Sequence, residues 1–115
     1  MLRIHDVAVD LVAEVMPMLG AIERFDPDLA RQGRRALTST PLNISEGSDQ
    51  VGKRRIQHYR IALGSARETW SALKVAEAAK FLPTPTPELK SRFDHVIGTL
   101  HRCIYGKSEM ARISM

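Results

Sequence analysis

The 115-residue chain contains few of the residues that form disulfides, metal cages and aromatic cores. Cys103 is the only cysteine, which excludes an internal disulfide and a cysteine-based metal cage. Aromatic residues make up only 5% of the chain, against 43% for all hydrophobic residues, so the expected core is aliphatic and rich in alanine. Such a core favours helices packed on helices, and the length fits one domain over residues 1–115.

Long apolar runs are also missing from the sequence. No stretch of about 18 apolar residues is present, so we expect no membrane span and no membrane partner. The first ten residues, MLRIHDVAVD, include acidic side chains and lack the apolar run of a secretory signal. A single cysteine suits a reducing compartment, and we expect a cytoplasmic protein.

Catalytic motifs are absent as well. The sequence has no P-loop, no dinucleotide-binding glycine pattern and no nucleophile elbow. Its four histidines form no i, i+4 pair, and His101 and Cys103 would lie on different faces of a helix. A histidine-based RNA-cleaving site at His58 stays open, although a single histidine near arginines carries little weight. We expect a protein that is not an enzyme and that uses neither a metal nor a cofactor.

Four helices are predicted from the spacing of apolar residues. In the first, apolar residues recur every three or four positions up to Phe25, and Pro17 is expected to kink it. The proline-rich segment 83–87 should be a stiff linker before the last helix. No alternation typical of strands is present. The expected fold is all-α, an antiparallel up-down four-helix bundle, with helices at about residues 6–25, 28–46, 53–81 and 88–106.

The third predicted helix carries two parallel rows of core-type positions. The large-residue row has heptad spacing and consists of Ile56, Tyr59, Leu63, Ala66, Trp70 and Leu73. The small-residue row beside it consists of Ala62, Ser65, Thr69, Ala72, Ala76 and Ala79. Two rows offer more contact surface than a short bundle partner needs, and small residues let another helix approach closely. The pattern therefore predicts self-association of the chain.

Positive charge is concentrated in the second and third helices. The net charge is +4, but residues 1–30 hold two basic and six acidic side chains, whereas residues 31–60 hold seven basic and two acidic ones. Lys53, Arg60, Arg67 and Lys74 recur every seven residues, forming a column about 30 Å long on one helix face. Such charge can be an ordinary solvated face, but polyanions are the partners it favours.

The placement of the cations favours nucleic acid. The second helix places its arginines opposite its apolar face. Basic residues also cluster at the start of the third helix, where their charge interacts unfavourably with the helix dipole. A binding role would explain this placement. Tyr59, Trp70 and Phe93 occupy core positions, which leaves few rings to stack on bases and predicts phosphate contacts with little sequence preference, to RNA or DNA. The predicted binding residues are Arg31, Arg34, Arg35, Lys53, Arg54, Arg55, Arg60, Arg67 and Lys74.

The stretches STPLNISEG and IALGSARE form a pair of motifs. The pair resembles the hallmark of the four helix bundle protein family, also called the 23S rRNA-intervening sequence protein family. The matching positions are Ser39, Pro41, Asn43, Ile44, Glu46, Gly47, Ile61, Ala62, Gly64, Ser65 and Glu68. Ser45 replaces the usual alanine, and the loop that follows is more basic than is usual for the family.

Most of the motif residues are expected to serve structure. Pro41 should bend the second helix, and Asn43 should satisfy the carbonyl that the proline frees. Gly47 should end that helix in a left-handed conformation. Glu46 and Glu68 are expected to pair with Arg35 or a neighbouring arginine. Gly64 and Ser65 are expected to permit close approach of another helix.

The resemblance also implies an assembly and a setting. It implies a ring-shaped homopentamer of all-helical protomers in the bacterial cytoplasm. The family is related to the accessory variability proteins of diversity-generating retroelements, which bind a reverse transcriptase and nucleic acid. An alternative function is therefore a protein-interaction scaffold, or an accessory subunit of a nucleic-acid enzyme such as a reverse transcriptase, whose basic surface meets an acidic protein.

Overall fold

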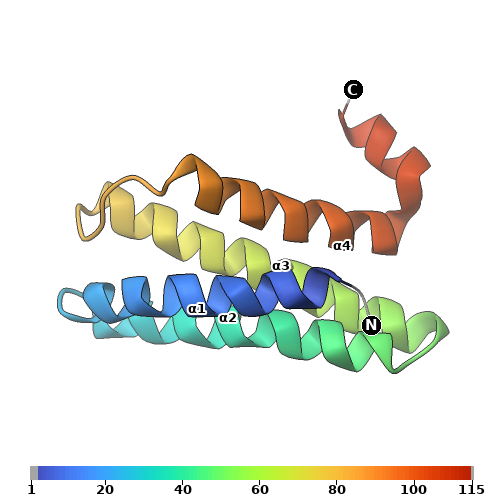
Figure 1. Ribbon diagram of the computed structural model, residues 1–115, viewed down its shortest axis with the longest axis horizontal. Helices are drawn as coiled ribbons and strands as arrows, with labels where there is room; N and C mark the ends of the chain where they lie inside the picture. Colours follow the sequence, from blue (N-terminus) through green and yellow to red (C-terminus); the bar gives the residue numbers. More distant parts are fainter. Residues whose placement is uncertain (1–2, 115) are drawn as a thin grey trace.

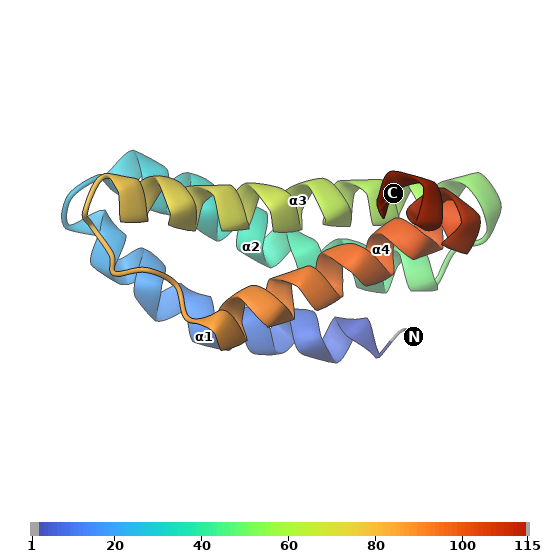
Figure 2. The same cartoon turned by 90° about the horizontal axis from the view of Figure 1, so that it is seen from above.

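The computed structural model describes the backbone of residues 3–114 and the side chains of residues 3–106. Four helices make up this part of the chain: α1 (Ile4–Glu23), α2 (Pro27–Ser48), α3 (Gly52–Ala78) and α4 (Pro87–Ser114). They run alternately up and down (Figure 1), and α1 and α4 form one layer beside the layer of α2 and α3 (Figure 2). No strand occurs in the described backbone. The predicted four-helix, all-α fold is confirmed.

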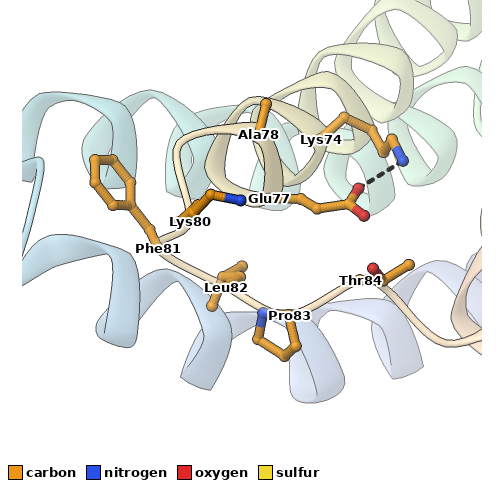
Figure 3. A pocket seen from close by; sticks show the side chains of 8 residues that line it. All are labelled: Lys74, Glu77, Ala78, Lys80, Phe81, Leu82, Pro83 and Thr84. Carbon is orange, nitrogen blue, oxygen red and sulfur yellow. Dashed lines mark hydrogen bonds and ion pairs between the residues drawn. The ribbon is translucent and has the colours of Figure 1, made fainter.

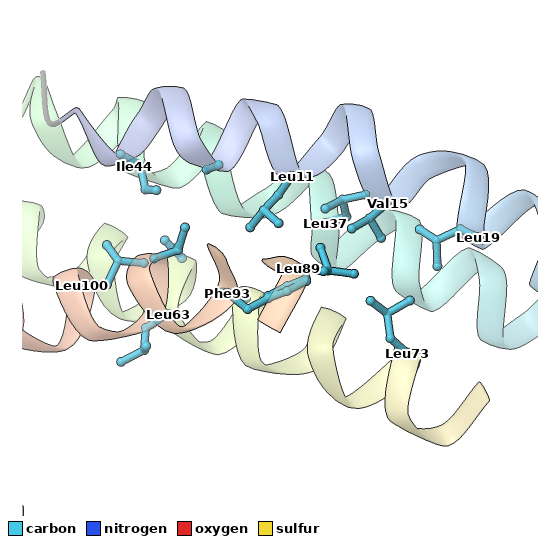
Figure 4. Packing of buried hydrophobic residues seen from close by; sticks show 14 of the residues in the cluster. Leu11, Val15, Leu19, Leu37, Ile44, Leu63, Leu73, Leu89, Phe93 and Leu100 are labelled. Atoms are coloured by element: carbon cyan, nitrogen blue, oxygen red, sulfur yellow. The ribbon is translucent and has the colours of Figure 1, made fainter. Parts of the chain in front are cut away.

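A single aliphatic core fills the space between the four helices (Figure 4). Its fully buried side chains are leucines, isoleucines and valines from every helix, with Phe93 as the largest. Trp70 packs on Phe93 with ring centroids 5.2 Å apart, and Tyr59 is 4% exposed. The three aromatic residues expected at core positions therefore pack in or against the core, with Trp70 partly buried.

The turn between α1 and α2 begins earlier than the apolar spacing predicted. The N–H groups of Phe25 and Asp26 both donate to the carbonyl of Ile22, so the chain leaves the helix after Glu23. Asp26 then caps α2 by accepting a hydrogen bond of 3.0 Å from the N–H of Leu29. Phe25 lies outside α1 and is 61% exposed. Its predicted place on the inner face of the first helix is wrong.

The other helix ends also differ from the prediction. α3 ends at Ala78 rather than Phe81, because Lys80 takes a left-handed conformation (φ 67°) and the N–H of Phe81 donates to the carbonyl of Ala76. Thr86 caps α4 by accepting from the N–H of Leu89. α4 also extends beyond its predicted end at residue 106. The chain turns there (φ 80°, ψ 171°) and continues as helix to Ser114.

Gly47 has a different role from the one predicted. α2 continues through Gly47 to Ser48, and the residue is buried inside the helix rather than ending it. A Cβ atom at this position would lie 2.5 Å from Cε1 of Tyr59 and 3.2 Å from Cβ of His58. The missing side chain therefore lets α3 approach α2 closely.

The small-residue row of α3 is used within the protomer. Ala62, Thr69, Ala72 and Ala76 are all buried, and α2 and α3 form the most extensively packed helix pair. The row is therefore not free to bind a second protomer, although its position beside the large-residue row had suggested that it would be. Gly64 differs from the prediction in the opposite way: it is exposed, and nothing lies within 4 Å of a Cβ placed there.

Candidate nucleic-acid interface

Three motif residues and one histidine form a hydrogen-bonded junction between α2 and α3, which we call the polar junction and define as Ser39, Asn43, His58 and Ser65. The amide Nδ2 of Asn43 donates to both the carbonyl and the Oγ of Ser39, each at 3.0 Å. Ser65 Oγ donates to Ser39 Oγ at 2.9 Å across the two helices. The Ser39 carbonyl can only accept, so Asn43 turns its oxygen toward His58, whose Nδ1 lies 3.0 Å away and must donate.

The polar junction shows that Asn43 does not have its predicted partner. It also supports a structural role for the motif. Pro41, inside α2, would free the carbonyl of Leu37, four residues earlier. Asn43 instead binds Ser39 and His58. His58 thus uses Nδ1 to hold α3 against α2. Among the described residues no group of three or more His, Cys, Asp or Glu side chains is placed to hold a metal ion.

Arg55 joins the same two helices at their common turn. Its Nε donates to the carbonyl of Gly47 at 3.1 Å, and its Nη2 donates to the carbonyl of Ser48 at 3.2 Å. These carbonyls belong to the last turn of α2, where a cation also stabilises the negative end of the helix dipole. Arg55, one of the cations clustered at the start of α3, thus has a structural role.

The two motif glutamates do not form the predicted ion pairs. Glu46 and Glu68 are both exposed, and neither lies within ion-pair distance of a cation in the described part of the chain. Glu68 and Arg35 instead line one open depression of about 450 Å³ between α2 and α3, together with Ser39 and Ser65 of the polar junction.

The arginines of α2 fall into two groups. Arg31 pairs with Asp28 one turn earlier, and Arg34 pairs with Glu23 of α1. Their charges are already compensated within the protomer. Arg35 is exposed and has no carboxylate partner among the described side chains. The predicted basic face of α2 therefore offers one uncompensated arginine instead of three.

The predicted column on α3 lies entirely at the surface. Lys53, Arg60, Arg67 and Lys74 are all exposed. Lys74 pairs with Glu77 at 2.6 Å and lies 6.0 Å from the centre of the Trp70 ring. The other three have no carboxylate partner within the described residues. Together with Arg35 and Arg54, they form the set that we call the unpaired cations.

Three of the unpaired cations, Lys53, Arg54 and Arg60, lie near the start of α3. An open depression of about 720 Å³ is lined there by Lys53, Arg55, Arg60 and three uncharged residues. The first turn of α3 contains no acidic residue, and Val51 before it provides no side-chain cap. Positive side chains and unoccupied backbone N–H groups thus share one end of the helix, an arrangement that attracts anions.

Two features of the surface were not anticipated from the sequence. One is the capping contact of Arg55, which depends on how closely α2 approaches α3. The other is an exposed stack of Phe25 on Phe81, with parallel rings (2°) and centroids 5.0 Å apart. The two residues are distant in the sequence, and only the meeting of two interhelical connections brings them together.

No helix of the described chain combines the length and the apolarity needed to cross a membrane. Neither the curated proteins nor the solved structures compared with the chain give a match. One family description, "23S rRNA-intervening sequence protein", matches residues 1–102. This match spans all four helices up to the last turn of α4 before Gly106, and it includes both motifs. The chain belongs to the 23S rRNA-intervening sequence protein family.

Proposed function

We propose that this chain is a non-enzymatic, homo-oligomeric protein that binds nucleic acid through its basic surface, chiefly at phosphates and with little sequence preference. The observation that carries the proposal is the run of Lys53, Arg60 and Arg67 along the exposed face of α3, with no carboxylate partner among the described residues. Seven-residue spacing places successive cations about 10 Å apart, so the run can follow a phosphate backbone.

Phosphate groups match this surface better than the edges of bases or a small molecule would. The depression at the start of α3 is lined by three cations and by no carboxylate. Lys53 is a flexible point charge, and Arg60 can bind two phosphate oxygens at once. Contacts of this kind position a nucleic acid without reading its sequence.

A filter-binding titration across salt concentrations tests the proposal. The wild type should bind a 20-nucleotide RNA or DNA with an affinity that falls steeply with salt, because each neutralised phosphate releases a counterion. Replacing Lys53, Arg60 and Arg67 by glutamine should lower the log–log salt slope by about 2 to 3. The matched control replaces Arg31 and Arg34, whose charges are already paired, and should change the slope by less than about 1.

Two results would contradict the proposal. One is a wild type without a salt slope. The other is a greater loss of binding in the Arg31 and Arg34 variant than in the α3 variant. Circular dichroism of each variant checks that the fold is retained.

The self-association part of the proposal rests on the outer face of α2 and α3. Leu42 is 65% exposed and Ile61 is 41% exposed, and Gly64 on the same face of α3 has open space around its Cβ position. An exposed glycine with apolar neighbours fits a surface that a second copy of the chain covers. Closed symmetry would repeat the unpaired cations around a ring, in line with the pentamer that the family resemblance implied.

Light scattering on a size-exclusion column measures the oligomer. The wild type should elute as a closed oligomer at micromolar concentration, and Ile61→Glu should yield smaller species because it places a charge in an apolar contact. Ala72→Leu is not a test of assembly, because Ala72 is 7% exposed and its enlargement would disturb the protomer itself. A monomeric wild type would refute this part of the proposal.

A second candidate function is a protein-binding scaffold or an accessory subunit of a nucleic-acid enzyme such as a reverse transcriptase. The compensated arginines of α2 and the exposed Leu42 on the same helix favour it, because a surface with mixed charge and exposed apolar area suits a protein contact. Pull-down of the native complex with and without nuclease separates the two functions. A protein partner that remains after nuclease treatment would favour the scaffold.

A further inference from the structure

The stacked pair of Phe25 and Phe81 is a rigid aromatic surface at the end of the bundle opposite the start of α3. Phe81 is half-buried and packs against the core, and one face of Phe25 lies on it. Phe25 is nevertheless 61% exposed, so its other face is open to solvent. Parallel rings with centroids 5.0 Å apart are offset, which is a favourable aromatic geometry.

The backbone on both sides holds the two rings in place. The Asp26 cap begins α2 immediately after Phe25. The left-handed Lys80 and the hydrogen bond from the N–H of Phe81 to the carbonyl of Ala76 fix the other connection. The open ring is therefore preorganised, and a ligand that stacks on it need not order a flexible loop.

The charges around the pair are positive after internal compensation. Glu23, Asp28 and Glu77 at this end are each paired with a cation, and Asp26, beside Phe25, accepts only the backbone N–H of Leu29 within the described structure. With Arg24 and Lys80 counted against Asp26, one positive charge is in excess. Arg24 and Lys80, which adjoin the two phenylalanines, are exposed. Lys80 and Phe81 also line an open depression of about 700 Å³ with Lys74, the last member of the α3 column (Figure 3). The column thus leads from the start of α3 toward the aromatic pair.

The size of the pair selects among possible ligands. A stable protein–protein interface buries more than about 1,000 Å², far more than one ring can contribute. One ring face flanked by cations corresponds instead to one unpaired base and its neighbouring phosphates, the arrangement used by proteins that bind single strands. A duplex keeps its bases stacked inside and offers no free base face along its length.

We infer that Phe25 is a stacking platform for an unpaired base of a single-stranded nucleic acid, with Arg24 and Lys80 placed for the flanking phosphates. The inference rests on the proposed nucleic-acid binding and adds a preference for single strands. Stacking is tolerant of sequence, because every base has a π face, so the preference does not require base-specific hydrogen bonds.

Fluorescence anisotropy with a labelled 20-nucleotide RNA of mixed sequence, and with its duplex, tests the inference. Phe25→Leu keeps an apolar side chain but removes the aromatic face, and it should weaken single-strand binding by about 5- to 50-fold. Duplex binding should stay within about twofold. Tyr105→Leu is the comparison variant, because Tyr105 is an exposed ring at the opposite end of the bundle, near the cations at the start of α3, and its loss should weaken single-strand binding less than Phe25→Leu does.

A second variant guards against a purely structural explanation. Phe25→Trp should retain single-strand affinity, and its fluorescence should be quenched when the single strand binds, beyond the response of Trp70 in the wild type. Equal single-strand affinities of wild type and Phe25→Leu would overturn the inference while leaving the proposed function in place. So would a Phe25→Leu variant that loses thermal stability but no affinity. A wild type that binds neither probe would end both.

Discussion

The α2–α3 contact and the α1–α4 contact are opposite seams of one bundle, and they are held together differently. α2 and α3 are joined across the interface by the polar junction, by the two hydrogen bonds of Arg55 and by close backbone approach at Gly47. α1 and α4 share far fewer contacts, and their one polar link among the described residues is the exposed ion pair of Arg92 and Glu14. Two depressions, of about 510 and 290 Å³, lie along this second seam.

The difference shows where the family motif acts. All of the motif positions lie on α2 and α3, and three of them, Ser39, Asn43 and Ser65, are joined to one another by hydrogen bonds. Directional hydrogen bonds and a missing side chain specify one register between two helices, whereas an aliphatic contact tolerates small shifts. The motif therefore fixes the geometry of one helical hairpin, and the outer face of that hairpin carries the unpaired cations.

The largest expected effect is that of Gly47→Ala. The added Cβ would lie 2.5 Å from the buried Tyr59 ring, so α3 must move, at a cost of about 1–3 kcal/mol in the free energy of unfolding. Gly64→Ala is the control, because it meets nothing within 4 Å and should stabilise the protomer by about 0.5–1 kcal/mol through helix propensity. Urea unfolding measures both. Similar effects at the two glycines would contradict the claim that α2 and α3 approach closely at Gly47.

Asn43→Ala should have the next largest effect. It leaves the Nδ1 of His58 without its acceptor and removes both donations to Ser39, with an expected loss of about 1–3 kcal/mol. Ser45→Ala, two residues further along α2 and without a side-chain hydrogen bond in the described structure, should change stability by less than about 0.5 kcal/mol. Chemical denaturation of both variants would show whether the amide holds the seam. Equal stabilities would mean that it does not.

The smallest effect is expected at the other seam. Arg92→Gln removes the exposed ion pair with Glu14, and such pairs contribute about 0–1 kcal/mol. The effect should disappear in 1 M salt, because exposed charges are screened. A loss above about 2 kcal/mol that persists in high salt would show that α1 and α4 depend on this link as strongly as α2 and α3 depend on the polar junction.

Periodicity predicted the number, order and inward faces of the helices, because apolar spacing directly reflects which side of a helix is buried. It could not predict the ends as well. At Phe25 the three- and four-residue spacing continues although the backbone has already left the helix, so the ring was assigned to the inside. Lys80 was placed inside a helix for the same reason, because no sequence signal marks its left-handed conformation.

The candidate interface could be predicted only in part from the sequence, for a related reason. The α3 column follows from seven-residue spacing and is exposed as predicted. The pairing of Arg34 with Glu23 depends on how α2 rotates against α1, and the contact of Arg55 with Gly47 depends on the distance between α2 and α3. Gly47 and Gly64 have opposite environments, and nothing in their residue type separates them.

The up-down order of the helices has a practical consequence for labelling. Because the bundle has an even number of helices, α1 begins at the end of the molecule where α2 turns into α3, and the packed part of α4 finishes there too (Figure 1). Phe25 lies one full α1 length away, and 20 residues span roughly 30 Å. A dye attached at Arg3, just before α1, would therefore sit beside the Lys53 end and leave the aromatic end unobstructed. Resonance energy transfer from such a dye to the 5′ or 3′ end of a bound strand would reveal in which direction the strand runs along α3.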